Sequence, residues 1–265
     1  MPTTDEVVLH SSPEELPREF LEIVGDARPT CRLTISEVHD LAVRLHRQKN
    51  QRYGMTKDHD GGMDGWHEYR HHLTAVLLIL RLAGITDECF LAAALMHDVF
   101  EDTDFTVRDA IIAGVPIYAV AMAWACTDAA KGTRAEKKAE AYRKINLVYG
   151  AVIVKVADRI HNAGHSLESG SVGKFEFYKL EQTSFAEALE ATFHAQSQTN
   201  LWHHLEWLLF SSEGHHLVYK RSECCENALV PSITELVALL TRQLAALPAR
   251  VCNVALRSRR QRQQW

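Results

Sequence analysis

Residues 96–103 read Met-His-Asp-Val-Phe-Glu-Asp-Thr and directly follow an apolar run, Leu-Ala-Ala-Ala-Leu, at residues 91–95. Such a run is typical of a helix that is buried on all sides, and His97 and Asp98 stand at its end. Burying a histidine beside several carboxylates costs several kcal/mol unless a cation or another partner compensates. The stretch therefore predicts a helical core that carries a metal site.

A second stretch has the same character. Residues 151–162 read Ala-Val-Ile-Val-Lys-Val-Ala-Asp-Arg-Ile-His-Asn, so that a nearly apolar helix ends in Asp158, with Asn162 on the same face one turn later. A further pair of histidines, the second of them His72, lies on another predicted helix. Two imidazoles and two carboxylates suit manganese, iron or zinc and leave positions open for water and substrate. The predicted metal ligands are His72, His97, Asp98 and Asp158.

Glu101 and Asp102 lie one helical turn beyond the His-Asp pair. A carboxylate near a metal ion can orient and deprotonate an attacking water, so both are candidate catalytic residues. The alternative is that they form an acidic pair before the helix that starts near Thr106 and stabilise the dipole of that helix.

The sequence on both sides of these stretches predicts an all-α fold. A capping-box pattern at Thr34 and Glu37 begins a first helix that extends to about residue 51. Further helices are predicted over 68–82, ended by Gly84, over 87–97, from Thr106, and near 116–127, 133–148 and 150–164. Between the first two helices the glycine-rich segment 57–65 predicts a loop, and no alternating strand is apparent.

Three segments are expected along the chain. Residues 1–33 contain four prolines and predict an irregular arm, and residues 34–195 form the main helical domain. Residues 196–265 predict a helical C-terminal appendage, with one helix over 232–247 and a basic tail at 257–262. Histidines 203, 204, 215 and 216 are interpreted as surface polar residues, and the appendage is a candidate contact for a homo-oligomer.

Composition excludes several classes of protein. A net charge of −5 argues against a protein that coats nucleic acid, so nucleic acid is not an expected partner. The six cysteines contain no C-x-x-C pair, which argues against a disulfide framework or a zinc ribbon and favours reduced thiols in the cytoplasm. The N-terminus lacks a secretory signal, and the longest uncharged apolar run, 110–126, is shorter than the ~20 residues of a bilayer span, so no membrane partner is expected.

Taken together, the motifs resemble a known signature. His72, residues 96–103 and residues 154–162 are similar to the H…HDxxEDT…KxADRxHN pattern of the hydrolase domain of RelA/SpoT-type alarmone enzymes and their small stand-alone relatives. The resemblance covers residues 36–195 and includes a Y-x-x-E-x-x-x-F stretch over 178–185. It implies an HD-domain helical bundle that binds Mn²⁺ and hydrolyses the 3′-pyrophosphate of guanosine tetra- or pentaphosphate, releasing pyrophosphate and GDP or GTP.

The resemblance also implies roles for individual residues. The metal ligands would be His72, His97, Asp98 and Asp158. Glu101 and Asp102 would activate water. Asn162 would contact the nucleotide substrate. Lys155 and Arg159 add positive charge to the same helix, and Arg52 in the preceding loop is a further candidate for substrate binding.

Three departures from the family pattern fall on substrate recognition. Leu73 replaces a proline, His165 replaces a threonine, and the loop over 49–67 is longer than the short family loop that carries a basic pair near the guanine. Two alternatives therefore stay open beside the alarmone hydrolase. One is an HD phosphohydrolase that acts on another nucleotide or phosphorylated small molecule, and the other is a metal-binding but inactive regulatory domain. No synthetase domain is recognisable after residue 195.

Overall fold

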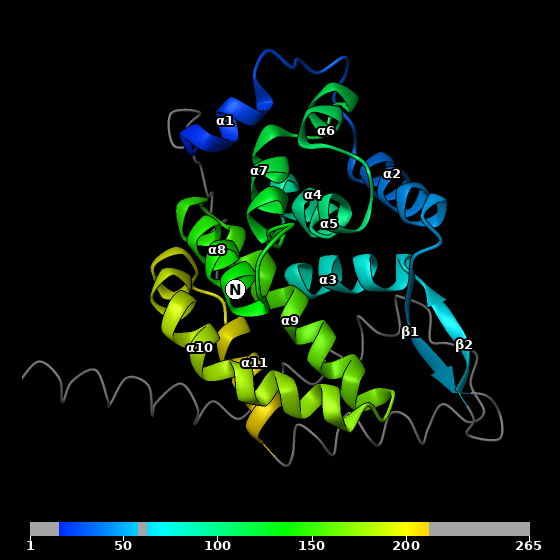
Figure 1. The fold of residues 1–265 in the computed structure, drawn as a ribbon, viewed down its shortest axis with the longest axis vertical. Helices are drawn as coiled ribbons and strands as arrows, with labels where there is room; N and C mark the ends of the chain where they lie inside the picture. Colours follow the sequence, from blue (N-terminus) through cyan, green and yellow to red (C-terminus); the bar gives the residue numbers. More distant parts are fainter. Residues whose placement is uncertain (1–15, 58–62, 212–265) are drawn as a thin grey trace, which may run out of the picture. The chain divides into compact units, whose positions relative to one another are not determined.

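The computed structural model describes residues 16–57 and 63–211, and these are almost entirely helical (Figure 1). The all-α prediction is confirmed, apart from one hairpin described below. The helices are α1 (Arg18–Val24), α2 (Ile35–Gln48), α3 (Arg70–Leu82), α4 (Glu88–Met96), α5 (Val99–Asp102), α6 (Val107–Ala113), α7 (Ile117–Cys126), α8 (Arg134–Leu147), α9 (Ala151–Glu168), α10 (Val172–Gln196) and α11 (Leu201–Phe210).

Helices α4 and α9 form the centre of the bundle. Every residue from 90 to 96 in α4 is at most 3% exposed, and α2, α3, α7 and α9 all contact this helix. The first half of α9, residues 151–157, is likewise buried except for Lys155. Full burial of each large apolar side chain stabilises the fold by roughly 1.5–3 kcal/mol, so the apolar runs of both helices are buried in the core. The polar residues at the ends of these runs are buried together with them.

Local capping fixes where the helices begin. In α2 the Thr34 hydroxyl accepts a hydrogen bond from the Glu37 backbone N–H, while the Glu37 carboxylate accepts one from the Thr34 backbone N–H. Thr106 and Asp109 form the same reciprocal pair at the start of α6. Each cap contributes about 1 kcal/mol. Both predicted helix starts are thereby confirmed.

The segment between α2 and α3 differs from the prediction of a strandless loop, which is wrong here. Strands β1 (Arg52–Lys57) and β2 (Met63–Glu68) pair antiparallel, with Tyr53 opposite His67. The pairing shifts register between Tyr53 and Met55 and again between Thr56 and Lys57. A register shift breaks the two-residue alternation of side chains that identifies a strand in a sequence. Figure 1 shows the hairpin beside one end of α3.

The N-terminal arm is not irregular throughout. Within the described part of residues 1–33, α1 presents Phe20 to the core, where it is fully buried and its ring centroid lies 5.5 Å from that of Trp124. The prediction of an irregular arm is thus wrong over residues 18–24. It missed α1 because Pro13 and Pro17 suggested a loop, whereas Pro17 directly precedes the helix, where proline is tolerated.

The first helix that begins after residue 195 is α11, which packs on α9 and α10. Trp202 of α11 is 2% exposed and stacks on Phe185, with ring centroids 5.5 Å apart. The division at residue 195 stays a prediction. The helix predicted over 232–247, His215, His216 and the basic tail lie outside the described residues. Among the helices that are described, none is both long and apolar enough to cross a bilayer.

Candidate metal centre and adjoining cavity

The His-Asp pair lies at the turn between two helices. His97 caps the C-terminal end of α4 and Asp98 caps the N-terminal end of the short α5, both with helical backbone angles. The two side chains therefore lie together at the end of the core helix. The His97 Nδ1 is 2.8 Å from the carbonyl oxygen of Ala94. Because a carbonyl only accepts, Nδ1 carries the proton and the lone pair of neutral His97 is on Nε2.

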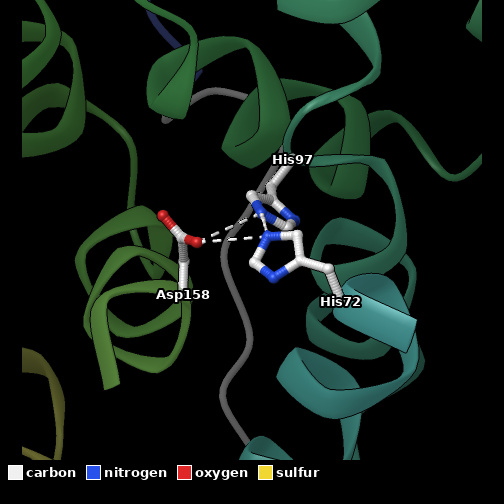
Figure 2. A group of neighbouring side chains, drawn as sticks. All are labelled: His72, His97 and Asp158. Atoms are coloured by element: carbon white, nitrogen blue, oxygen red, sulfur yellow. Dashed lines mark hydrogen bonds and ion pairs between the residues drawn. The ribbon is translucent and has the colours of Figure 1, made fainter. Parts of the chain in front are cut away.

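Three helices bring four potential ligand atoms together. The Nε2 atoms of His72 (α3) and His97 are 3.0 Å apart, and the Asp158 Oδ1 of α9 lies 3.3 and 3.5 Å from them (Figure 2). The ligand atoms of these three residues all lie within 4.8 Å of one another. The Asp98 Oδ2 is 3.2 Å from both imidazole nitrogens. The group of three could hold a metal ion, and its nitrogen and oxygen donors suit a divalent transition metal.

The electrostatics of this group favour a positive charge. Burial acts to lower the pKa of His97, but Asp98 and Asp158 outweigh it and raise that pKa to about 10. Burial acts to raise the pKa of both carboxyl groups, yet the facing imidazoles, and for Asp158 also Lys155, hold these pKa values well below their usual range. The two carboxylates that favour a proton on His97 equally favour a cation between the imidazoles.

Asp158 is held by two neighbours on its own helix. The Lys155 Nζ donates to Asp158 Oδ2 at 2.9 Å, and the Asn162 Nδ2 donates to Asp158 Oδ1. The spacings of three and four residues place all three side chains on one face of α9. Lys155 and Asn162 were predicted to contact substrate, and the structure places both against the metal-ligand group.

Asp98 is held by a residue that the sequence reasoning did not single out. The Tyr69 hydroxyl donates to Asp98 Oδ2 at 2.6 Å, and the Tyr69 ring stacks on His46 with centroids 4.0 Å apart. Asp102 lies on this side too, its Oδ2 4.0 Å from the His46 Nε2. Burial and the charge of Asp98 raise the pKa of Asp102. Tyr69 stands one helical turn before His72, a spacing that could have identified it.

A cavity of about 260 Å³ adjoins the metal-ligand group, and Asp98, Asp158 and Asn162 line it. Glu101 lines it as well, whereas Asp102 is not among its described lining residues. The Glu101 Oε2 accepts a hydrogen bond from the Asp128 backbone N–H at 3.1 Å. Burial raises the pKa of Glu101. The structure therefore separates the two predicted catalytic carboxylates, with one on the cavity and one behind Tyr69.

Arg159 lines the cavity but is already engaged by the protein. Its Nε donates to Gln182 Oε1 at 3.1 Å, its Nη2 donates to the Tyr178 carbonyl oxygen at 2.7 Å, and its guanidinium lies 4.5 Å from the Phe185 ring centroid. With 6% exposure, the side chain is buried between α9 and α10. Arg159 was predicted to bind substrate, and its contacts also tie these two helices together.

Two further cations on α8 line the cavity and were not predicted. Arg134 pairs with Glu181 at 3.0 Å, and Lys138 pairs with Asp128 at 3.3 Å. They are four residues apart and so share one face of the helix. Their spacing is visible in the sequence, but only the packing of the bundle places that face of α8 on the cavity.

Arg52 lies apart from this group. Its side chain is exposed and lines a different pocket, of about 180 Å³, together with Tyr69 and Arg70. Arg52 is not among the described residues that line the larger cavity. The structure thus does not bring Arg52 together with the other predicted substrate-binding residues.

Comparisons with known proteins point to one group of enzymes. No family model matches the chain. The chain is 34% identical over 128 residues to the human guanosine-3′,5′-bis(diphosphate) 3′-pyrophosphohydrolase MESH1, an alignment that spans 48% of this chain and 65% of the human protein. A solved structure, described as a metazoan orthologue of SpoT that hydrolyses ppGpp and plays a role in starvation responses, matches with a TM-score of 0.50 and 26% identity, over 68% of this chain and 96% of that one. The resemblance to RelA/SpoT-type HD hydrolases is confirmed.

The resemblance to the RelA/SpoT-type hydrolases extends to the cavity wall. Tyr178, Glu181 and Phe185, which make up the Y-x-x-E-x-x-x-F stretch, all line the cavity from α10. The stretches that carry the resemblance are thus adjacent in space although they are far apart in the sequence.

Proposed function

We propose that the protein is a metal-dependent pyrophosphohydrolase that removes the 3′-pyrophosphate of guanosine tetra- or pentaphosphate. The observation that carries the proposal is the buried group of His72, His97 and Asp158, with Asp98 beside it, at the edge of a cavity lined by cations. The named activities of the human relative and of the metazoan SpoT orthologue support this substrate.

Mn²⁺ is the proposed ion, with His72, His97, Asp98 and Asp158 as its ligands. A divalent ion held there supplies charge neutralisation for a phosphate and a lowered pKa for an attacking water. In the proposed reaction, water adds to the phosphorus, the bond from that phosphorus to the ribose 3′ oxygen breaks, and this oxygen leaves with a proton. The products are pyrophosphate and GDP or GTP.

The proposed proton acceptor is Glu101. Its carboxylate faces the cavity, and the Asp128 N–H fixes one of its oxygens. Burial against the cavity wall raises the pKa of Glu101, which makes its carboxylate a stronger base than a fully solvated one. Asp102 is assigned a supporting part, since it faces Tyr69 and His46.

Four cations line the cavity and would meet the phosphates: Lys155, Arg159, Arg134 and Lys138. Lys155 lies nearest to the ligand group, because it donates to Asp158. Arg134 and Lys138 pair with carboxylates of side chains that are part exposed, so a polyphosphate could replace those carboxylates as their partner. Asn162, next to Asp158, is the proposed contact to the nucleoside.

The proposal includes a cytoplasmic location, supported by the cysteines: Cys31, Cys89 and Cys126 are free thiols in the structure. A homo-oligomer through the C-terminal appendage stays a prediction, because most of that segment lies outside the described residues. Nucleic acid stays excluded from the proposal on the basis of the net charge of −5.

The deciding experiment is pyrophosphate release from guanosine tetraphosphate by the full chain with Mn²⁺, beside a panel of other nucleotides. A variant with His97→Ala and Asp98→Ala is the control. Turnover of the tetraphosphate that the variant lacks would support the proposal, and turnover of a different nucleotide would keep the metal centre but reject the substrate. A folded protein that binds Mn²⁺ and turns over none of them would favour the inactive regulatory domain.

A further inference from the structure

Tyr53 on β1 reaches from the hairpin into the metal centre. Its side chain is buried, with 8% exposure, and its ring stacks on the His72 imidazole at a centroid distance of 4.4 Å and an interplanar angle of 8°. The rings of His161 and His165 lie on other sides of it, with centroids 5.2 and 4.9 Å away. Tyr53 thus limits how far the His72 ring can tilt.

The hydroxyl of Tyr53 acts on a second ligand through Asn162. This hydroxyl is 2.7 Å from Asn162 Oδ1, and the amide of Asn162 faces Asp158 on its other side. An ionised carboxylate only accepts hydrogen bonds, so the Asn162 NH₂ must face Asp158 and its oxygen must face Tyr53. The Tyr53 hydroxyl is therefore the donor, and it fixes the amide in the orientation that holds Asp158 Oδ1.

We propose that Tyr53 is a positioning residue that braces two metal ligands on two different helices, His72 on α3 by stacking and Asp158 on α9 through Asn162. The hairpin thereby becomes part of the metal centre. The inference rests on the metal site of the proposed function but does not depend on which nucleotide is hydrolysed.

The surroundings of Tyr53 fit this role. Burial and the charge of Asp158 raise the pKa of Tyr53, so its hydroxyl keeps the proton that it donates. The Tyr69 ring meets that of Tyr53 edge-on at 5.9 Å, and the Tyr69 hydroxyl holds Asp98. Two neighbouring tyrosines thus each hold one carboxylate of the ligand set, one directly and one through an amide. Partners of this kind, one step removed from a metal, orient its ligands.

The first test is a Mn²⁺ titration of the purified full chain, read by competition with a chelator. Tyr53→Phe keeps the ring and its stacking but removes the hydroxyl, and we expect Mn²⁺ affinity to fall about 10-fold, the low end for loss of such a partner. The matched control is Tyr149→Phe, which removes a hydroxyl that bonds the Gln196 carbonyl and is expected to leave the affinity unchanged. Tyr53→Phe with wild-type affinity would overturn the proposal.

The second test asks whether the hydroxyl acts through Asn162. In an Asn162→Ala background, Tyr53→Phe should weaken Mn²⁺ binding no further, because the intermediary has already been removed. An equal fold-loss in both backgrounds would overturn the proposed route. Circular dichroism of each variant is the check that it is folded. A Mn²⁺ titration needs no turnover, so a wild-type protein that binds Mn²⁺ but hydrolyses no alarmone would reject the substrate and still allow this inference to be judged.

Discussion

At the scale of single residues, the structure distinguishes two carboxylates that look equivalent in the sequence. Glu101 and Asp102 are neighbours, but α5 turns them in different directions. Glu101 lines the cavity and is held by the Asp128 N–H, while Asp102 lies close to His46. Only the first can reach a water in the cavity directly.

The first prediction follows from this difference. Glu101→Gln keeps the shape of the side chain but removes its basicity, so kcat should fall about 100-fold or more while Mn²⁺ affinity stays near that of the wild type. Asp102→Asn should have a smaller effect on kcat. Steady-state kinetics with saturating Mn²⁺ measures both, and Glu176→Gln, on the exposed side of α10, is the matched control. Equal losses for Glu101→Gln and Asp102→Asn would contradict the assignment.

The pH dependence of kcat is an independent test of the role of Glu101. Burial raises the pKa of Glu101 above the ordinary value of 4.5. A base acts only when it is deprotonated, so kcat at saturating Mn²⁺ should decline as pH falls through this raised pKa and be fully present above it. The residual activity of Glu101→Gln should lack that acidic limb. If kcat of Glu101→Gln still declined at low pH as in the wild type, that decline would belong to a different titrating group.

At the scale of elements, the placement of α9 depends on a glycine. Gly150 precedes α9 with a φ of +83°, and a Cβ there would come within 2.6 Å of the Phe90 ring and 2.9 Å of the Met122 sulfur. Phe90 lies on α4 and Met122 on α7, so Gly150 permits the close packing of three core helices. Since α9 carries Asp158, this packing also sets the position of a metal ligand.

The second prediction is a stability difference between two glycines. Gly150→Ala should lower the free energy of unfolding by about 2–4 kcal/mol, combining the cost of positive φ with overpacking. Gly170→Ala has a similar φ of +69° but open space around its Cβ, so it should cost only about 1 kcal/mol. Urea unfolding followed by circular dichroism measures both. Equal losses of unfolding free energy in the two variants would mean that contact of the new methyl group with Phe90 and Met122 adds nothing to the cost of the positive φ.

The elements also show what a single sequence can predict. Capping residues such as Thr34 and Thr106 act within one turn, and the apolar run before His97 marks a buried helix by itself, so these features were predictable. The hairpin was not, because its register shifts remove the alternation of side chains and its pairing is visible only in three dimensions. The metal-ligand group was predictable because its charged residues crowd together within short stretches of sequence. Tyr53 and the cavity cations of α8 were missed. Their roles depend on which elements pack together.

At the scale of the whole molecule, the metal site and the core are built from the same helices. His72, His97 and Asp158 are each at most 4% exposed and come from α3, the end of α4, and α9. A buried set of two imidazoles and carboxylates is costly unless a positive charge lies among them. An ion bound there would therefore connect three helices that adjoin the centre of the bundle, and binding should be linked to folding.

The third prediction is that Mn²⁺ stabilises the folded protein. At 100 times its Kd, an ion that binds only the folded state adds about 2.7 kcal/mol, which for a chain of this size raises Tm by about 5–10 °C. A chelator should reverse the shift, and His97→Ala should abolish it because one imidazole ligand is lost. His194→Ala, which removes a half-exposed histidine of α10 near Glu190, should keep it. A Mn²⁺ shift of equal size in His97→Ala would place the stabilising ion elsewhere on the protein and remove the link between the metal centre and the core.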